Sequence, residues 1–149
     1  MPRPILISAC LLGLQTRYDG CSKFNAKVMA YLEANELLPI PVCPEQLGGL
    51  PTPRPPARFV RGDGNAVLDG RGEIETVSGL NRNAAFRAGA AETLRIARLT
   101  GCKEALLKER SPSCGVHRIY QGDRLIAGEG VASALLRREG IRIQSEEEL

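Results

Sequence analysis

The sequence predicts an α/β fold in which a small, mainly parallel sheet carries helices on both faces. Short apolar runs alternate along the chain with stretches of helical period, which is the pattern of parallel strands joined by crossover helices. A length of 149 residues fits one domain, spanning residues 1–149, and no repeat or linker divides it. Right-handed crossovers then favour the strand order 2-1-3-4 in this single three-layer domain.

The first half of the chain predicts two strands and one helix. Residues 3–9 form an apolar run and predict the first strand. Residues 25–34 carry apolar side chains at helical spacing and predict a helix. Residues 37–42 predict the second strand, and Pro39 and Pro41 favour an edge position because proline cannot donate a backbone hydrogen bond.

A long loop and a hairpin are expected next. Residues 44–58 are rich in proline, and a loop of this length in a small domain is usually functional. We expect Gly48 and Gly49 to let this loop pass close to a ligand. Residues 58–61 and 66–68 predict a small hairpin around Gly-Asp-Gly-Asn, a sequence that favours tight turns.

The second half predicts two helices and two strands. Residues 78–100 show the strongest helical pattern, and 131–138 predict a second helix. Residues 104–108 and 141–143 predict strands, and the acidic residues 145–149 predict a solvated end. The apolar positions that recur in the long helix are Leu80, Ala84, Ala88, Ala91, Leu94, Ile96 and Leu99.

Composition excludes several classes of function. No apolar run approaches the roughly 20 residues of a membrane span, and the first ten residues lack the features of a signal peptide. We therefore expect a cytoplasmic protein. The net charge of +3 is spread along the chain, and three Phe, three Tyr and no Trp offer few stacking platforms for RNA. The sequence thus gives no strong nucleic-acid signal and no signal for an oligomeric state.

Five cysteines in a chain of this kind favour metal binding or catalysis over disulfides. Cys10 and Cys43 end the first two predicted strands, and Cys114 follows the third by a short loop. Because the carboxyl ends of parallel strands meet at one edge of a sheet, we expect these three thiols to converge there. We interpret Cys102 as a packed core residue, whereas Cys21 lies in a loop from which it can approach the site as an auxiliary thiol.

Three converging thiolates repel one another unless a cation neutralises them, which indicates a metal centre. A catalytic zinc with an open position is one candidate, although the chain has no CxxC pair. A 4Fe-4S cluster held by three cysteines, with one iron lacking a protein ligand, is the other. The spacing leaves both open. His117, the one histidine, is interpreted as a surface residue.

Five motifs together resemble the thiouracil desulfurase family over nearly the whole chain. They are SACLLG at 8–13, RYDG at 17–20, CPEQLGGLPTPRPP at 43–56, KERSPSCG at 108–115 and GEGVASALL at 128–136. The resemblance implies a Rossmann-like fold and a 4Fe-4S cluster bound through Cys10, Cys43 and Cys114. It also implies catalytic roles for Glu45 and Ser111. Cys21 departs from the family pattern.

The resemblance implies an enzyme that removes sulfur from thiolated nucleobases such as 2-thiouracil. The open iron of the cluster would take the thiocarbonyl sulfur, and water would replace it without net electron transfer. Glu45 would activate the water or carry a proton to the ring, and Ser111 would hold the water or the heterocycle.

Two other functions compete with this interpretation. The alternative is a metal- or cluster-binding module for structure or sulfur carriage, without hydrolysis. A nucleotide-binding regulator ranks last, because CLLGLQ after the first strand contains one glycine and no glycine-rich fingerprint.

Overall fold

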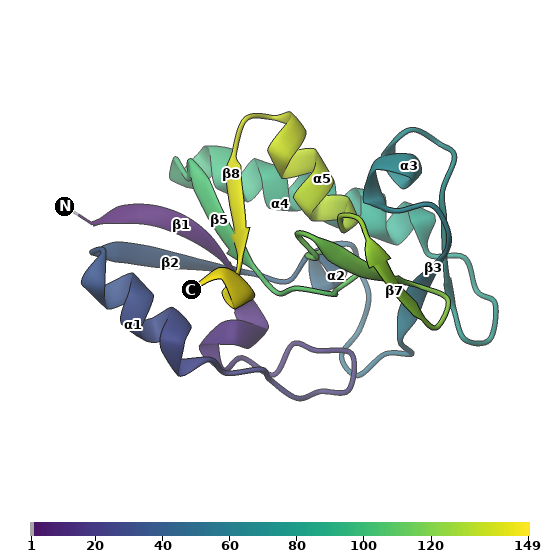
Figure 1. The fold of residues 1–149 in the computed structure, drawn as a ribbon, viewed down its shortest axis with the longest axis horizontal. Coiled ribbons are helices and arrows are strands. Elements are labelled where there is room, and N and C mark those ends of the chain that lie inside the picture. Colours follow the sequence, from purple (N-terminus) through teal and green to yellow (C-terminus); the bar gives the residue numbers. More distant parts are fainter. Residues whose placement is uncertain (1) are drawn as a thin grey trace.

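The main sheet is parallel throughout and has four strands. A computed structural model describes residues 2–149 and places β1 (Arg3–Ser8), β2 (Leu37–Val42), β5 (Glu104–Leu107) and β8 (Arg142–Ser145) in the order β2-β1-β5-β8 (Figure 1). Numbered along the chain as the four strands of this sheet, that order is the predicted 2-1-3-4. The proline-containing strand β2 lies at the edge, as predicted.

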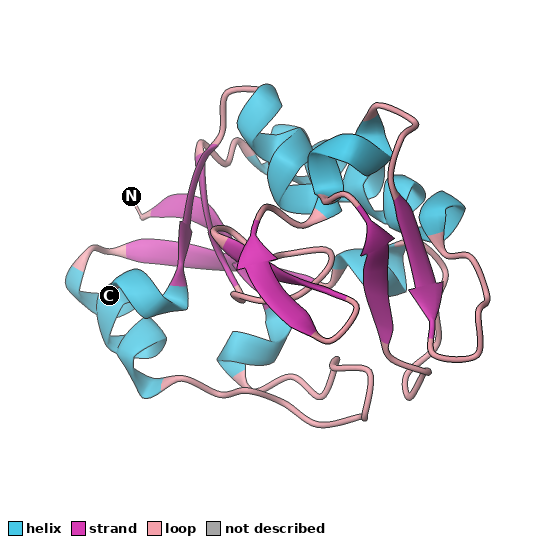
Figure 2. Cartoon of the chain, turned by 45° about the vertical axis from the view of Figure 1, so that its right-hand side comes forward, coloured by secondary structure: helices cyan, strands magenta, loops and turns pink. Residues whose placement is uncertain are grey.

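Helices cover both faces of this sheet and make the three layers that the sequence predicts. Side chains alternate along β1, so that Ile5 and Ile7 pack in one apolar cluster with α1 (Ala26–Ala34). Leu6 points the other way and packs in a second cluster with α4 (Asn83–Thr100) and α5 (Val131–Arg138). Figure 2 shows the sheet between these helices. In residues 2–149 no helix is long and apolar enough to cross a membrane.

A second sheet, which the sequence analysis did not predict, stands beside the first. It consists of β3 (Ala57–Arg61), β4 (Glu73–Thr76), β6 (Arg118–Gln121) and β7 (Arg124–Ala127), in the order β4-β3-β6-β7. The pairs β3–β4 and β6–β7 are antiparallel, and β3 meets β6 in parallel. The predicted parallel sheet is present, but the sequence analysis did not anticipate this second one, because its strands are short and bury at most two residues each.

The prediction of a hairpin at 58–61 and 66–68 is wrong. Residues 66–68 belong to a helix, α3 (Gly64–Leu68), and β3 pairs with β4 instead. The side chain of Asp63 accepts a hydrogen bond from the Ala66 N–H at 3.2 Å and caps this helix. An Asp-Gly pair favours both a tight turn and a helix start, and here the helix start forms.

The long helix begins at Asn83, five residues later than predicted, and of the predicted apolar positions its buried face contains only Leu94. The predicted apolar positions Leu80 and Leu99 are 54% and 78% exposed. The larger side chain of Phe86 anchors the buried face instead. That face consists of Phe86, Gly89, Ala90, Thr93, Leu94 and Ala97.

Two segments expected to be irregular contain short helices. Within the predicted loop, α2 (Pro44–Leu47) begins directly after Cys43. The acidic tail forms a 3-10 turn, η2 (Glu146–Glu148), in which the Glu146 carboxylate is buried. It accepts the Glu109 N–H at 2.7 Å and lies 3.1 Å from Lys108 Nζ. Ser145 and Glu146 are therefore packed on the end of the sheet, contrary to expectation, whereas Glu147, Glu148 and Leu149 are exposed as expected.

Candidate functional site

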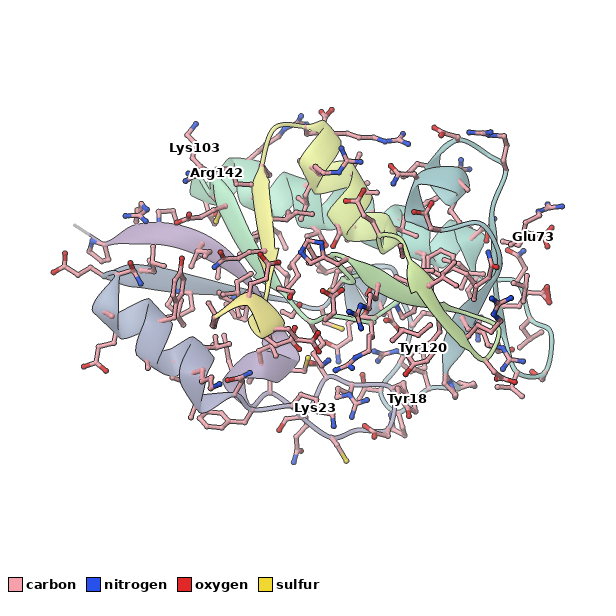
Figure 3. All side chains as sticks on the ribbon, viewed as in Figure 1. Tyr18, Lys23, Glu73, Lys103, Tyr120 and Arg142 are labelled. Carbon is pink, nitrogen blue, oxygen red and sulfur yellow. The ribbon has the colours of Figure 1, made fainter. Side chains whose placement is uncertain are left out.

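A cavity of about 660 Å³ opens at the carboxyl edge of the main sheet, where the second sheet meets it. This volume lies within the range of small-molecule sites, roughly 300–1,000 Å³. The main sheet contributes Ser8 at the end of β1, and the second sheet contributes Ala57 and Tyr120. Figure 3 labels Tyr18 and Tyr120, both of which line it. The cavity lies where ligands bind in parallel α/β sheets.

Cys10, Cys43 and Cys114 all line this cavity. Cys10 lies in a 3-10 turn, η1 (Ala9–Leu12), that continues directly from β1. Cys43 is the residue before the first turn of α2, and Cys114 lies in the turn that follows β5. Three segments that are distant in sequence thus present their thiols to one space.

Burial raises the pKa of two of these thiols. Burial, with a smaller contribution from the nearby Cys43 thiol, raises the pKa of Cys10 to about 11 and that of Cys114 to about 12. The Lys108 ammonium partly opposes this effect at Cys10. Both thiols are therefore protonated at neutral pH in the protein alone, and a bound metal centre would stabilise their thiolate forms.

The donor set around the cavity fits an iron-sulfur cluster better than a single ion. No group of three or more His, Cys, Asp or Glu side chains in residues 2–149 is placed to hold one metal ion. The thiolates around a cluster bind different irons and so lie farther apart than the ligands of one ion. Among the described residues, no fourth cysteine and no histidine lines the cavity. The three soft sulfur donors thus fit a cluster that keeps one position open.

Glu45 and two serines form a chain of hydrogen bonds along the cavity wall. Ser113 Oγ donates to Glu45 Oε2 at 3.1 Å and also lies 3.7 Å from Cys114 Sγ. Ser111 Oγ lies 3.0 Å from Ser113 Oγ and accepts the backbone N–H groups of Ser113 and Cys114. The two residues named from the sequence, Glu45 and Ser111, therefore meet through Ser113. Sequence reasoning missed Ser113, and its position next to Cys114 in SPSC was the available signal.

Arg54 is a second site residue that sequence reasoning missed. Its side chain is 4% exposed, and its Nε donates to Glu45 Oε1 at 2.9 Å. One Nη group donates to the Thr16 carbonyl at 2.9 Å and to Cys43 Sγ at 3.8 Å. The signal in the sequence was a charged residue within the proline-rich stretch PTPRPP. Its burial in the structure marks it further, because buried arginines are rare unless paired.

The position of Cys43 and Glu45 depends on close contact between α2 and α4. A Cβ added to Gly48 would lie 2.0 Å from the Ala85 carbonyl oxygen, and one added to Gly89 would lie 1.9 Å from the Pro44 carbonyl oxygen. The two backbones therefore touch through glycines. Gly48 serves this helix contact, so the expectation that it brings the loop close to a ligand is wrong.

The position of Cys114 depends on the start of α5. The Ala132 N–H donates to the Ser113 carbonyl at 2.9 Å, and Ser133 Oγ donates to the Cys114 carbonyl at 2.7 Å. A Cβ on Gly130 would lie 2.7 Å from the Cys114 nitrogen. The motif GEGVASALL thus supports the turn that carries Cys114.

Three other residues considered from the sequence, Cys102, His117 and Cys21, lie outside the cavity. Cys102 is buried in the core, as predicted, and His117 is a surface residue, as predicted, 2.6 Å from Glu148. Cys21 is exposed and does not line the cavity. Its N–H donates to Asp19, which holds the pKa of that carboxyl below its usual range.

Comparison with known proteins finds relatives over nearly the whole chain. The model of a family described as 2-thiouracil desulfurase matches residues 5–148. YbbK of Bacillus subtilis (strain 168), described as an uncharacterized protein, is 41% identical over 148 residues, which cover 97% of each chain. The solved structure of TudS, a 4Fe-4S-dependent thiouracil desulfidase, is 44% identical with a TM-score of 0.84 over 99% of this chain and 93% of that one. This similarity confirms the α/β fold.

Proposed function

This chain belongs to the 2-thiouracil desulfurase family, and on that premise we propose that it is an enzyme that removes sulfur from thiolated nucleobases. One observation supports the proposal above all. The three thiols suited to a cluster line the same cavity as Glu45, a carboxylate placed for proton transfer. A module that only binds a cluster for structure needs no such carboxylate beside it.

The cofactor that we propose is a 4Fe-4S cluster held by Cys10, Cys43 and Cys114. The similar protein TudS is described as dependent on such a cluster. When bound, the cluster supplies an iron without a protein ligand, a Lewis acid with affinity for soft thiocarbonyl sulfur.

Glu45 is the residue that we assign to proton transfer. A general base there takes a proton from the attacking water, and the resulting acid returns it to the ring nitrogen or to the departing sulfur. The hydroxyls of Ser113 and Ser111 extend the same chain of hydrogen bonds and hold the water or the heterocycle. One water enters, the oxo-base and hydrogen sulfide leave, and no electron is gained or lost.

Two tyrosines give the cavity surfaces suited to a planar ring. Tyr18 comes from the loop after η1 and Tyr120 from β6, and both line the cavity while remaining 38% and 45% exposed (Figure 3). Aromatic faces stack on any heterocycle, which supports a small-molecule nucleobase as the substrate.

The proposal is tested by reconstituting the protein anaerobically and measuring metal, acid-labile sulfide and turnover. We expect iron and sulfide in equal amounts, and conversion of 2-thiouracil to uracil with one sulfide released per uracil and no added reductant. A panel of thiolated bases and nucleosides then ranks substrates. Zinc without iron would overturn the cofactor. A loaded protein that converts none of the panel would favour the binding module without hydrolysis.

A further inference from the structure

Arg54 carries a buried positive charge in contact with Glu45, with Cys43 and with the loop that contains Thr16. The residue is 8% exposed, and all of its side-chain donors have partners. Burying an arginine is costly unless its charge is paired and its N–H groups are satisfied. A chain that keeps such a residue beside its active site therefore has a use for it.

The contacts of Arg54 link Glu45 with the cysteine two residues before it. Nε holds Glu45 Oε1 at 2.9 Å, and Ser113 holds the other oxygen of the same carboxylate at 3.1 Å. Nη2 reaches Cys43 Sγ at 3.8 Å. The planar fork of an arginine makes both contacts at once, which the single ammonium of a lysine does not.

Arg54 also fixes the wall of the cavity. Its Nη2 donates to the Thr16 carbonyl, and its backbone N–H donates to the Tyr18 carbonyl at 2.8 Å. Nη1 donates to the Pro51 carbonyl and to Thr52 Oγ1. Hydrogen bonds therefore join the loop that carries Tyr18 to the loop that carries Arg54.

We propose that Arg54 is a positioning residue that orients Glu45 for proton transfer and donates a hydrogen bond to the Cys43 thiolate when the cluster is bound. This inference rests on the proposed function. Hydrogen bonds and positive charge at a cluster sulfur favour the reduced, more negative state, so they raise the reduction potential. A small misplacement of a catalytic group lowers kcat while leaving substrate binding largely intact.

Four anaerobically reconstituted proteins test this: wild type, R54Q, R54K and R58Q. Arg58 also lines the cavity and is paired with Asp123, so R58Q removes the same charge without touching Glu45 or Cys43. We expect a cluster potential in R54Q below those of wild type and R58Q. We also expect kcat for 2-thiouracil to fall by about tenfold to a hundredfold with KM changed less than about threefold. R54K should recover part of the potential but little of kcat.

The outcomes separate this inference from the proposed function. Equal potentials and equal kcat values in R54Q and R58Q would overturn the role of Arg54. If R54Q does not retain iron, the cluster potential and kcat of R54K provide the test instead. Wild-type values of both in R54K would also overturn the role of Arg54. A loaded wild type without turnover defeats the proposed function alone, because the potential shift still supports the Arg54 contact. A wild type without iron overturns both.

Discussion

The carboxylate of Glu45 is held through both of its oxygens, one by Arg54 and the other by Ser113. Glu45→Gln keeps the size of the side chain and removes its capacity as a base. We expect turnover of 2-thiouracil to fall by about 10²- to 10⁴-fold. Iron content should stay at the wild-type level, because the proposed cluster ligands are the three thiols and not Glu45. Glu73→Gln, on β4 at the far edge of Figure 3, is the matched control. Unchanged turnover in E45Q would remove Glu45 from the mechanism.

The five cysteines divide into three that line the cavity and two that do not. Alanine at Cys10, Cys43 or Cys114 should each lower the iron bound after reconstitution, because each removes one thiolate. C21A should load like wild type, since Cys21 is exposed outside the cavity. Iron per protein and visible absorbance measure the result. Loss of iron in C21A would give that thiol the auxiliary role that the sequence left open.

Glu109 stabilises the turn that leads into Cys114. Burial alone would raise the pKa of its carboxyl, but hydrogen bonds from four backbone N–H groups outweigh this and lower it. A lowered folded-state pKa contributes stability above the ordinary value of 4.5, and that contribution is lost as pH falls through the folded value. The free energy of unfolding of the wild type should therefore decline on acidification below that value.

Glu109→Gln tests this carboxylate, because all four N–H groups donate to one oxygen and a neutral amide oxygen accepts them more weakly than a charged carboxylate oxygen. We expect the free energy of unfolding at neutral pH to fall by about 1–3 kcal/mol, measured by urea denaturation. The decline with acid should also be shallower. E92Q, in an exposed i,i+3 pair with Arg95, should differ from wild type by less than about 0.5 kcal/mol. An E109Q protein with wild-type stability and pH slope would show that the buried charge contributes nothing.

Helix α4 fixes the position of Cys43 and Glu45 through its contact with α2. Gly89→Ala would place a methyl group 1.9 Å from the Pro44 carbonyl oxygen, so α2 must shift. Overpacking of this kind costs about 1–3 kcal/mol, against a gain of about 1 kcal/mol in helix propensity. We expect a lower melting temperature and less bound iron, because the shift moves Cys43 away from the other two thiols.

Ala88→Gly provides the control for this substitution. Ala88 lies next to Gly89 on the exposed face of α4, so glycine there costs about 1 kcal/mol of helix propensity without touching α2. A88G should lower the melting temperature and still load iron like wild type. If A88G lost as much iron as G89A, general destabilisation would explain both, and the helix contact would have no special role.

The main sheet could be predicted because its two central strands, β1 and β5, carry apolar side chains on both faces. Ile5, Leu6 and Ile7 are all buried, and such runs are visible without knowledge of their partners. The second sheet is different, since Ile119 is buried in β6 while Tyr120 is exposed. Strands this short, with one apolar face, become stable only through pairing with segments far along the chain. That pairing is not encoded in any local pattern.

The candidate site likewise contains residues that could be predicted from the sequence and residues that could not. Cys10 and Cys43 follow strands of the predictable sheet, so their placement at one edge follows from parallel topology. The roles of Glu45 and Ser111 came from family resemblance and stay predictions. Ser113 and Arg54 contribute through hydrogen bonds to Glu45 that join segments 68 and 9 residues apart, and no spacing rule anticipates such contacts.

The cavity exists because the two sheets meet at the carboxyl edge of the first one. The main sheet supplies the thiols at its strand ends, and the second sheet supplies Tyr120 to the same cavity. The proposed cluster ligands thus follow strands of the main sheet, whereas the proposed ring-binding surfaces come from β6 and from the loop that carries Tyr18. Substrate range and cluster binding are for this reason separable by mutation, the first at Tyr18 and Tyr120 and the second at the ends of β1, β2 and β5.

Removal of the cluster should affect the three thiol-bearing segments together and leave distant elements unchanged. A group that binds only the folded protein stabilises it, so the loaded protein should melt at a higher temperature than the metal-free protein. Cys10, Cys43 and Cys114 lie in three separate segments that line the cavity, so loading should protect backbone amides in 10–23, 43–56 and 111–116 from hydrogen exchange. Helix α3 does not line the cavity and serves as the internal reference. Protection in all three segments, lost from all three in C114A, would indicate one shared group. Protection confined to one segment would mean that the three thiols do not bind the same cluster.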